Sequence, residues 1–118
     1  MNAMSHKGHS GIAGKRRAHA PVFAALGDET RLSLVAKLSV GRRCSISQLA
    51  GGSKLTRQAI TKHLRVLEGA GIVRGVRAGR EMLFEFDPQP MEAIQTYLDL
   101  VSEQWDQALA RLKSFVED

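Results

Sequence analysis

Residues 45–71 have the sequence SISQLAGGSKLTRQAITKHLRVLEGAG, and this stretch decides the fold. Ser45, followed three residues later by Gln48, is the capping-box pattern that begins a short helix, which two glycines end. After a turn of three residues, Thr56 caps a longer helix, whose apolar residues recur on one face: Ile60, Leu64 and Leu67. The pattern predicts a short helix, a tight turn and a longer, two-faced helix.

The outer face of the longer helix carries hydrogen-bonding and cationic residues and no acid. In a helix-turn-helix, the first helix braces the second, whose outer face enters the major groove of DNA, about 12 Å wide. Arginine can bind guanine and glutamine can bind adenine with two hydrogen bonds each, whereas lysine and arginine can also neutralise phosphates. We therefore expect this segment to bind double-stranded DNA through Lys54, Thr56, Arg57, Gln58, Thr61, Lys62 and Arg65.

The next segment, from Ile72 to Asp87, changes from helical to strand periodicity. In its second half, Met82, Phe84 and Phe86 alternate with Leu83 and Glu85, as in a β-strand. Ala78 and Gly79 supply a turn before them, so a β-hairpin is predicted. Arginines on a projecting hairpin suit the minor groove or its phosphates, and here they are Arg74, Arg77 and Arg80. The hairpin is thus predicted to be a wing. The alternative is an ordinary small helical domain with solvated lysines and arginines.

Helical patterns flank this central motif on both sides. Pro21 suits the first turn of a short helix that Gly27 ends. Asp28 is the predicted N-cap of the next helix, whose expected buried residues are Leu32, Val35 and Leu38. From Met91, a long helix carries apolar residues at alternating steps of four and three: Ile94, Leu98, Val101, Trp105, Ala108, Leu112 and Phe115. Such a seam predicts a partner helix.

Composition limits the class of protein. A chain of 118 residues with 43% hydrophobic and 25% charged residues is typical of one globular domain with a tail. No apolar stretch is long enough to span a membrane, and the run after the basic residues 15–17 is too short for an export signal, so a cytoplasmic protein is expected. The single cysteine, Cys44, excludes an intramolecular disulfide.

Charge is distributed unevenly along the chain. The net charge is +6 over residues 1–53, +6 over residues 54–80 and −7 over residues 81–118. The middle block coincides with the helix-turn-helix pattern, which favours a polyanionic partner. Residues 1–19 are rich in glycine and poor in large apolar side chains, so they are expected to form a disordered basic arm before a domain over residues 20–118.

Three segments together resemble the ArsR/SmtB family of winged-helix repressors. They are GDETRL at 27–32, SQLA at 47–50 and AITKHLRVLEGAGIV at 59–73, and the resemblance extends over residues 21–118. It implies repression by operator occupancy and a homodimer joined through its first and last helices, in agreement with the seam described above. The expected interface residues are Val22, Phe23, Leu26, Ile94, Leu98, Val101, Trp105, Leu112 and Phe115.

The metal ligands of that family are missing from this sequence. Many members bind metals through a Cys-x-Cys pair, where this chain has Ser45 and Ser47, or through Asp and His on the last helix, which here contains no histidine. A serine hydroxyl does not replace a thiolate toward soft metals, so neither metal nor cofactor is expected. The histidines of the arm, His6, His9 and His19, lie in a segment too mobile to hold coordination geometry.

Three single residues leave alternatives open. Cys44 is either a redox switch beside two arginines or a small buried hydrophobe. Trp105 belongs to an interface core or lines a ligand pocket between protomers. For His63, packing or a backbone contact is favoured over catalysis and metal binding.

The sequence therefore predicts a mostly α-helical winged helix-turn-helix protein that binds a palindromic operator as a homodimer. The alternative is a winged-helix module that docks an acidic protein partner, but such a face would carry more aromatic or apolar anchors. The acids lie beside no nucleophile, and no glycine-rich phosphate loop is present, so an enzyme is not expected. The sequence identifies no inducer.

Overall fold

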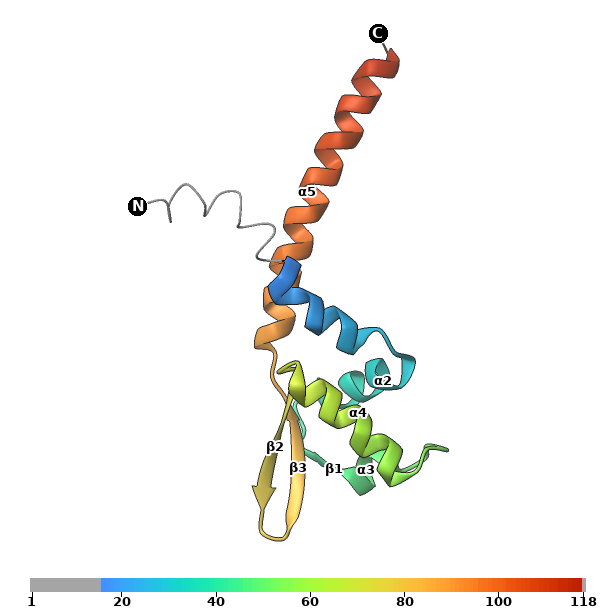
Figure 1. Cartoon of the computed structure of the whole chain (residues 1–118), viewed down its shortest axis with the longest axis vertical. Coiled ribbons are helices and arrows are strands. Elements are labelled where there is room, and N and C mark those ends of the chain that lie inside the picture. Colours follow the sequence, from blue (N-terminus) through green and yellow to red (C-terminus); the bar gives the residue numbers. More distant parts are fainter. Residues whose placement is uncertain (1–15, 118) are drawn as a thin grey trace, which may run out of the picture.

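The computed structural model describes residues 16–117 and consists of helices with a small antiparallel sheet at one end, opposite the projecting end of the last helix (Figure 1). The first helix covers residues 16–26. It is followed by α2 (Glu29–Leu38), β1 (Cys44–Ser45), α3 (Ile46–Ala50), α4 (Arg57–Gly69), β2 (Val73–Ala78), β3 (Glu81–Phe86) and α5 (Gln89–Glu117). The predicted architecture is confirmed: α3 and α4 form the helix-turn-helix, and β2 with β3 forms the wing.

The three predicted helix caps are present. The Asp28 carboxylate accepts a hydrogen bond from the Arg31 backbone N–H at 3.0 Å. The Ser45 hydroxyl and the Gln48 side chain each accept from the other residue's backbone N–H, which completes the capping box of α3. The Thr56 hydroxyl accepts from the N–H of Ala59 at 3.0 Å. These local bonds set where α2, α3 and α4 begin.

The sheet has the order β1-β3-β2, with Arg74 opposite Glu85. The hairpin turn is Gly79 and Arg80, one residue later than predicted, and Gly79 has φ 64°, as the first position of a two-residue type II′ turn requires. Strand β1 was not predicted. Its two residues are too few to show a strand period, and it exists because Cys44 pairs with Phe84 of β3.

The hydrophobic core joins α2, α3, α4 and the hairpin. Its most buried large side chains are Phe84, Leu34, Leu38, Leu49, Ile60, Leu64, Leu67, Ile72 and Val73. The prediction for α2 was wrong at Leu32, which is 52% exposed, because the buried face is defined by Leu34 and Leu38, and Leu32 lies about half a turn from Leu34. Val35 is only partly buried. This core holds α4 in a fixed position against the wing.

The first helix and α5 both begin earlier than predicted. Residues 16–19, assigned to the arm, are helical, and the His19 ring lies 5.4 Å from the ring of Tyr97, centroid to centroid. That contact with α5 stabilises a segment that composition alone favoured as disordered; residues 1–15 of the predicted arm lie outside the described residues. Helix α5 begins at Gln89, whose N–H donates to the Asp87 carboxylate at 3.0 Å, before the predicted start at Met91.

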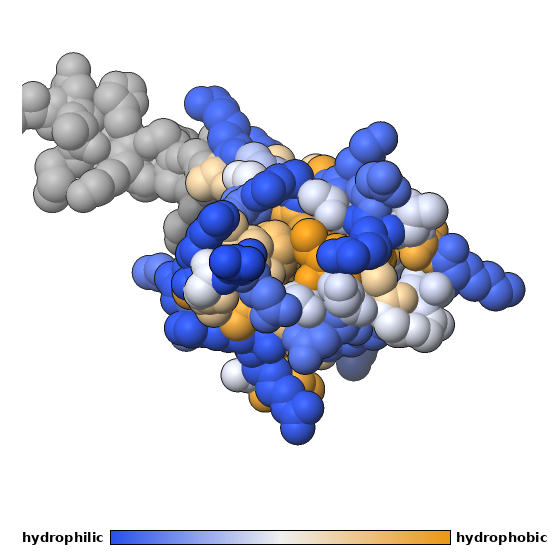
Figure 2. Space-filling model, turned by 90° about the horizontal axis from the view of Figure 1, so that it is seen from below, coloured by the Kyte–Doolittle hydropathy of each residue, from blue (hydrophilic) through white to orange (hydrophobic). Residues whose placement is uncertain are grey.

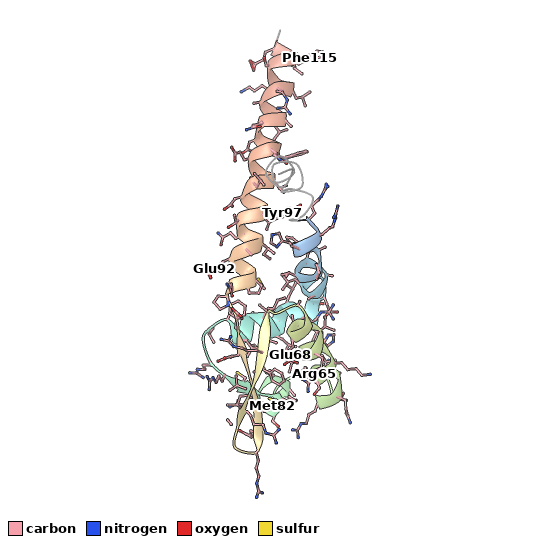
Figure 3. The ribbon with its side chains drawn as sticks, turned by 60° about the vertical axis from the view of Figure 1, so that its left-hand side comes forward. Arg65, Glu68, Met82, Glu92, Tyr97 and Phe115 are labelled. Atoms are coloured by element: carbon pink, nitrogen blue, oxygen red, sulfur yellow. The ribbon has the colours of Figure 1, made fainter. Side chains whose placement is uncertain are left out.

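Helix α5 projects well beyond the body of the protein, with Phe115 near its far end (Figure 3). The first helix crosses beside only the lower part of α5, next to Tyr97 (Figure 3). Within residues 16–117, no helix is both long and apolar enough to cross a membrane. Beyond Tyr97, most residues of α5 are exposed in the single chain, and only Leu100 and Ala108 are half-buried.

Candidate nucleic-acid interface

The polar face of α4 is accessible to a ligand. Because Ile60, Leu64 and Leu67 point into the core, the opposite side of the helix faces solvent. Arg57, Gln58, Lys62 and Arg65 are exposed, as is Lys54 in the preceding turn, and Thr61 is half-buried. The Thr61 hydroxyl donates to the Arg57 carbonyl at 2.7 Å, so its hydrogen is engaged within the helix.

The start of α4 borders two hollows that connect it to α3 and the wing. The larger, of about 770 Å³, is lined by Ile46, Arg57, Gln58, Thr61 and Lys62. The smaller, of about 190 Å³, includes Ile46 and Arg57 again, with Arg80, the acidic Glu81 and Met82 from the hairpin. The end of the molecule that carries α3 and the hairpin tip shows hydrophilic side chains projecting around a small apolar centre (Figure 2). Helix α4 and the wing thus contribute to one surface.

The predicted DNA-binding arginines and lysine of α4 and the wing fall into two groups. Arg65 pairs with Glu68 at 2.8 Å, and Arg74 pairs with Glu85 at 2.7 Å, so part of their charge is neutralised within the chain. Within the part of the chain that the structure describes, no ion pair is formed by the others on α4 and the wing: Arg57, Lys62, Arg77 and Arg80. These four side chains present their full charge to solvent.

Glu85 connects the wing to the loop before β1. Its carboxylate accepts from Arg74 Nε at 2.7 Å and from Arg43 Nε at 2.9 Å. These hydrogen bonds, from Arg74 first and then Arg43, hold the pKa of Glu85 below its ordinary value. The pairing depends on the register of β2 against β3 and on the unpredicted β1, so sequence reasoning missed it.

Glu68 connects α4 to the wing on the other side. One carboxylate oxygen accepts from Arg65 and the other accepts from the N–H of Gly75 at 3.4 Å (Figure 3). A side chain at Gly75 would place its Cβ 3.0 Å from the Met82 sulfur and 3.4 Å from Glu68, so only glycine fits this approach without displacement. The orientation of the wing relative to α4 is thereby fixed.

His63 lies on the inner side of α4, facing α2. Its Nδ1 is 3.2 Å from Nη1 of Arg31 and 3.7 Å from the carboxylate of Asp28. The hydrogen bond from the Arg31 backbone N–H, with a smaller contribution from the charge of Arg31, lowers the pKa of Asp28. His63 therefore contacts charged side chains of α2, where packing or a backbone contact was expected.

The predicted dimer residues separate into buried and exposed sets. Val22 and Ile94 belong to the core of the protomer itself, with 7% and 6% exposure. Phe23 and Leu26 are partly buried against that core. An exposed apolar set remains on α5, in which Leu109 and Val116 were not predicted: Leu98, Val101, Trp105, Leu109, Leu112, Phe115 and Val116.

Potential metal ligands are scattered in the structure. Among residues 16–117, no three His, Cys, Asp or Glu side chains gather as a metal site would require. His19 packs on Tyr97, Ser45 caps α3, and the half-buried Cys44 contacts the Arg42 carbonyl through its sulfur at 3.9 Å. His6 and His9 lie outside the described residues.

Comparison with known proteins gives consistent matches to transcriptional regulators. A family model described as a helix-turn-helix domain matches residues 26–76. The transcriptional regulator Rv2034 of Mycobacterium tuberculosis is 31% identical, over 80% of this chain and 85% of the relative. The regulator YuzN of Bacillus subtilis is 36% identical, over 60% of this chain and 84% of the relative.

A solved structure is similar over almost the whole described chain. An ArsR-like transcriptional regulator from Rhodococcus sp. RHA1 superposes with a TM-score of 0.76 and 35% identity. The match covers 86% of this chain and 95% of that one. It therefore includes more than the central motif.

Proposed function

Because this chain belongs to the ArsR/SmtB family of winged helix-turn-helix transcriptional regulators, we propose that it represses transcription by occupying a palindromic operator as a homodimer. The family consists of DNA-binding regulators and not of enzymes. The proposal concerns the mode of action, the residues that contact DNA and the assembly.

The observation that carries the proposal is the exposed face at the start of α4, whose hollow has no acidic lining residue, and which adjoins the wing through a second hollow with one acid, Glu81. Arg57, Gln58, Thr61 and Lys62 line one hollow there, and all are residue types that bind base edges or phosphates. The alternative, a module that docks an acidic protein, is less favoured because the hollow has no aromatic lining residue to act as an anchor.

We assign different contacts to different parts of this surface. Arg57 and Gln58, at the start of α4, bind base edges in the major groove, with Thr61 and Lys62 beside them. Lys54, Thr56 and Arg65 contact phosphates. On the wing, Arg77 and Arg80 enter the minor groove or contact its phosphates, whereas Arg74 contributes less because Glu85 already binds it.

The apolar seam on α5 supports the homodimer. Trp105 is 64% exposed and Phe115 is 80% exposed in the single chain, and a row of such side chains on one helix is typical of an interface. A two-fold dimer presents two α4 helices, so the half-sites of its operator are separated by one or two turns of DNA, roughly 34 Å per turn. Binding at a promoter excludes polymerase, and the protein acts in the bacterial cytoplasm.

Selection of bound sequences from a random duplex pool tests this function. The selected sites are expected to be palindromic, and their affinity is expected to fall steeply between about 50 and 200 mM salt, because bound cations release counterions from the phosphates. Fluorescence anisotropy at several salt concentrations measures this dependence. Failure to enrich any sequence, or an affinity that does not change with salt, contradicts the proposal.

A further inference from the structure

The apolar side chain of Ile46 lies among the polar residues of the proposed DNA-binding surface. It is the first residue of α3, it is partly buried against the core, and it lines both hollows beside Arg57. Hydrogen bonding to bases and phosphates does not account for an isoleucine at this place. The question is which group of the DNA it contacts.

The surface of the larger hollow is mostly carbon, although four of its five lining residues are polar. Ile46 contributes its apolar side chain, and the hydroxyl hydrogen of Thr61 is already bound to the Arg57 carbonyl. Arg57 and Lys62 place cations at the hollow, and none of the five residues is acidic. A group that fits must be apolar at its tip and surrounded by hydrogen-bond acceptors or negative charge.

The major groove of duplex DNA presents one such group. The C5-methyl of thymine projects into the groove beside the O4 acceptor, and the adenine of the same base pair offers the edge to which glutamine binds. The methyl of 5-methylcytosine occupies the same position on its ring. The hollow therefore combines, within one site, apolar contact for a methyl group, Gln58 for adenine and cations for the backbone.

We propose that the hollow between α3 and α4 binds the C5-methyl group of a pyrimidine, with Ile46 as the contact residue. This inference rests on the proposed function and adds a determinant of its specificity. It requires a thymine or a 5-methylcytosine at one fixed position of each operator half-site, next to the bases that Arg57 and Gln58 contact. Because Ile46 makes no hydrogen bond there, its contribution is tested by removal of the methyl group from the DNA.

A scan with deoxyuridine tests the inference. Each thymine of the selected operator is replaced in turn by deoxyuridine, which lacks only the methyl group, and affinity is measured by anisotropy. Deoxyuridine is expected to weaken binding at one position of each half-site, and the two positions are related by the symmetry of the operator. The expected loss is about fourfold per half-site, as burial of one methyl group predicts. The ratio of thymine to uracil affinity is measured within one protein preparation, so it is insensitive to partial unfolding.

Variants of the protein test whether Ile46 causes the preference for thymine over uracil. Ile46→Ala is expected to bring the ratio at the sensitive position close to one, and Ile46→Val to reduce it in part. Leu55→Ala is the matched control, because Leu55 is a partly exposed aliphatic residue between α3 and α4 that does not line the hollow. This control is expected to keep the full ratio.

Cytosine duplexes identify the source of the methyl group. With a cytosine at the sensitive position, 5-methylation is expected to raise affinity by the same factor as thymine over deoxyuridine if either methylated pyrimidine fits, and thymine alone is the ligand if it does not. The change of the base pair to G·C affects both cytosine duplexes equally. An operator without any thymine-sensitive position, or an unchanged ratio in Ile46→Ala, overturns the inference while sequence-specific binding persists. If the unaltered protein shows no sequence-specific binding at all, the proposed function is contradicted instead.

Discussion

The guanidinium of Arg31 binds the inner side of α4 through His63, with 3.2 Å between Nη1 and Nδ1. Because a guanidinium only donates, Nδ1 is the acceptor, and neutral His63 carries its hydrogen on Nε2. The Nε of Arg31 also donates to the carbonyl of Ala25 at 2.6 Å. One side chain of α2 thereby connects the end of the first helix with the helix that carries the proposed base contacts.

Replacing Arg31 is expected to destabilise the fold. Arg31→Ala removes both hydrogen bonds and leaves the Ala25 carbonyl without this donor, which costs about 1–3 kcal/mol of unfolding free energy. Urea denaturation followed by circular dichroism measures the loss. Arg42→Ala is the control, since that exposed arginine forms no side-chain hydrogen bond within the described part of the chain. Equal stability of the two variants would show that the bonds of Arg31 contribute nothing net.

Stability is expected to fall in acid partly because of Glu85. Its pKa in the folded protein is below the ordinary value of 4.5, so the folded state favours the charged carboxylate. Its contribution is present above pH 4.5 and disappears as the pH falls through the lowered pKa, because protonation breaks the contacts with Arg74 and Arg43.

Urea denaturation at a series of acidic pH values tests this dependence. Glu85→Gln is expected to flatten the acid side of the stability curve relative to the unaltered protein. Glu81→Gln, on the same strand and without an ion pair among residues 16–117, is expected to leave the curve unchanged. Identical curves for the unaltered protein and Glu85→Gln would exclude a role for this carboxylate.

Arg57 and Arg77 are expected to differ in their effect on specificity. Arg57→Ala should weaken the selected operator by about 1–3 kcal/mol and change random DNA little, because base contacts distinguish sequences. Arg77→Ala should weaken both duplexes more evenly, since a phosphate contact is independent of sequence. Competition anisotropy with operator and random DNA measures both. Equal losses on the two duplexes for Arg57→Ala would contradict base contact.

Trp105 is expected to stabilise the dimer. Truncation of an exposed tryptophan at the centre of an interface costs at least about 2 kcal/mol, so Trp105→Ala should raise the dimer dissociation constant by roughly thirtyfold. Light scattering over a dilution series measures the shift. Gln107→Ala changes an exposed residue about half a turn away on α5 and should leave association intact. A dimer that is unaffected by Trp105→Ala would place this residue outside the interface.

Local chemistry made much of the fold predictable from the sequence. Asp28, Ser45 and Thr56 cap their helices through bonds that span three residues, and the buried face of α4 follows from helical spacing alone. The same reasoning found the exposed cations of α4 and the wing, because the residues of a two-faced helix are assigned by elimination once its core is known.

Features that depend on contacts distant in sequence were not predictable. Strand β1 and the pairing of Arg43 with Glu85 require the sheet register, and Leu32 was misplaced because two helical faces fit the apolar pattern of α2. Val22 and Ile94, both predicted at the dimer interface, are buried in the protomer core, and that burial depends on packing between segments distant in sequence. Ile46 carried no sequence signal for a role on the surface.

Because α5 carries its apolar seam beyond the body, operator occupancy depends steeply on the number of chains in the cell. If association occurs through the projecting apolar seam, the DNA-competent species is a pair of chains, and at low abundance its amount grows with the square of the number of chains in the cell. Halving synthesis would then reduce operator occupancy by more than half. Regulation would switch off sharply on dilution, as during rapid growth, without any ligand.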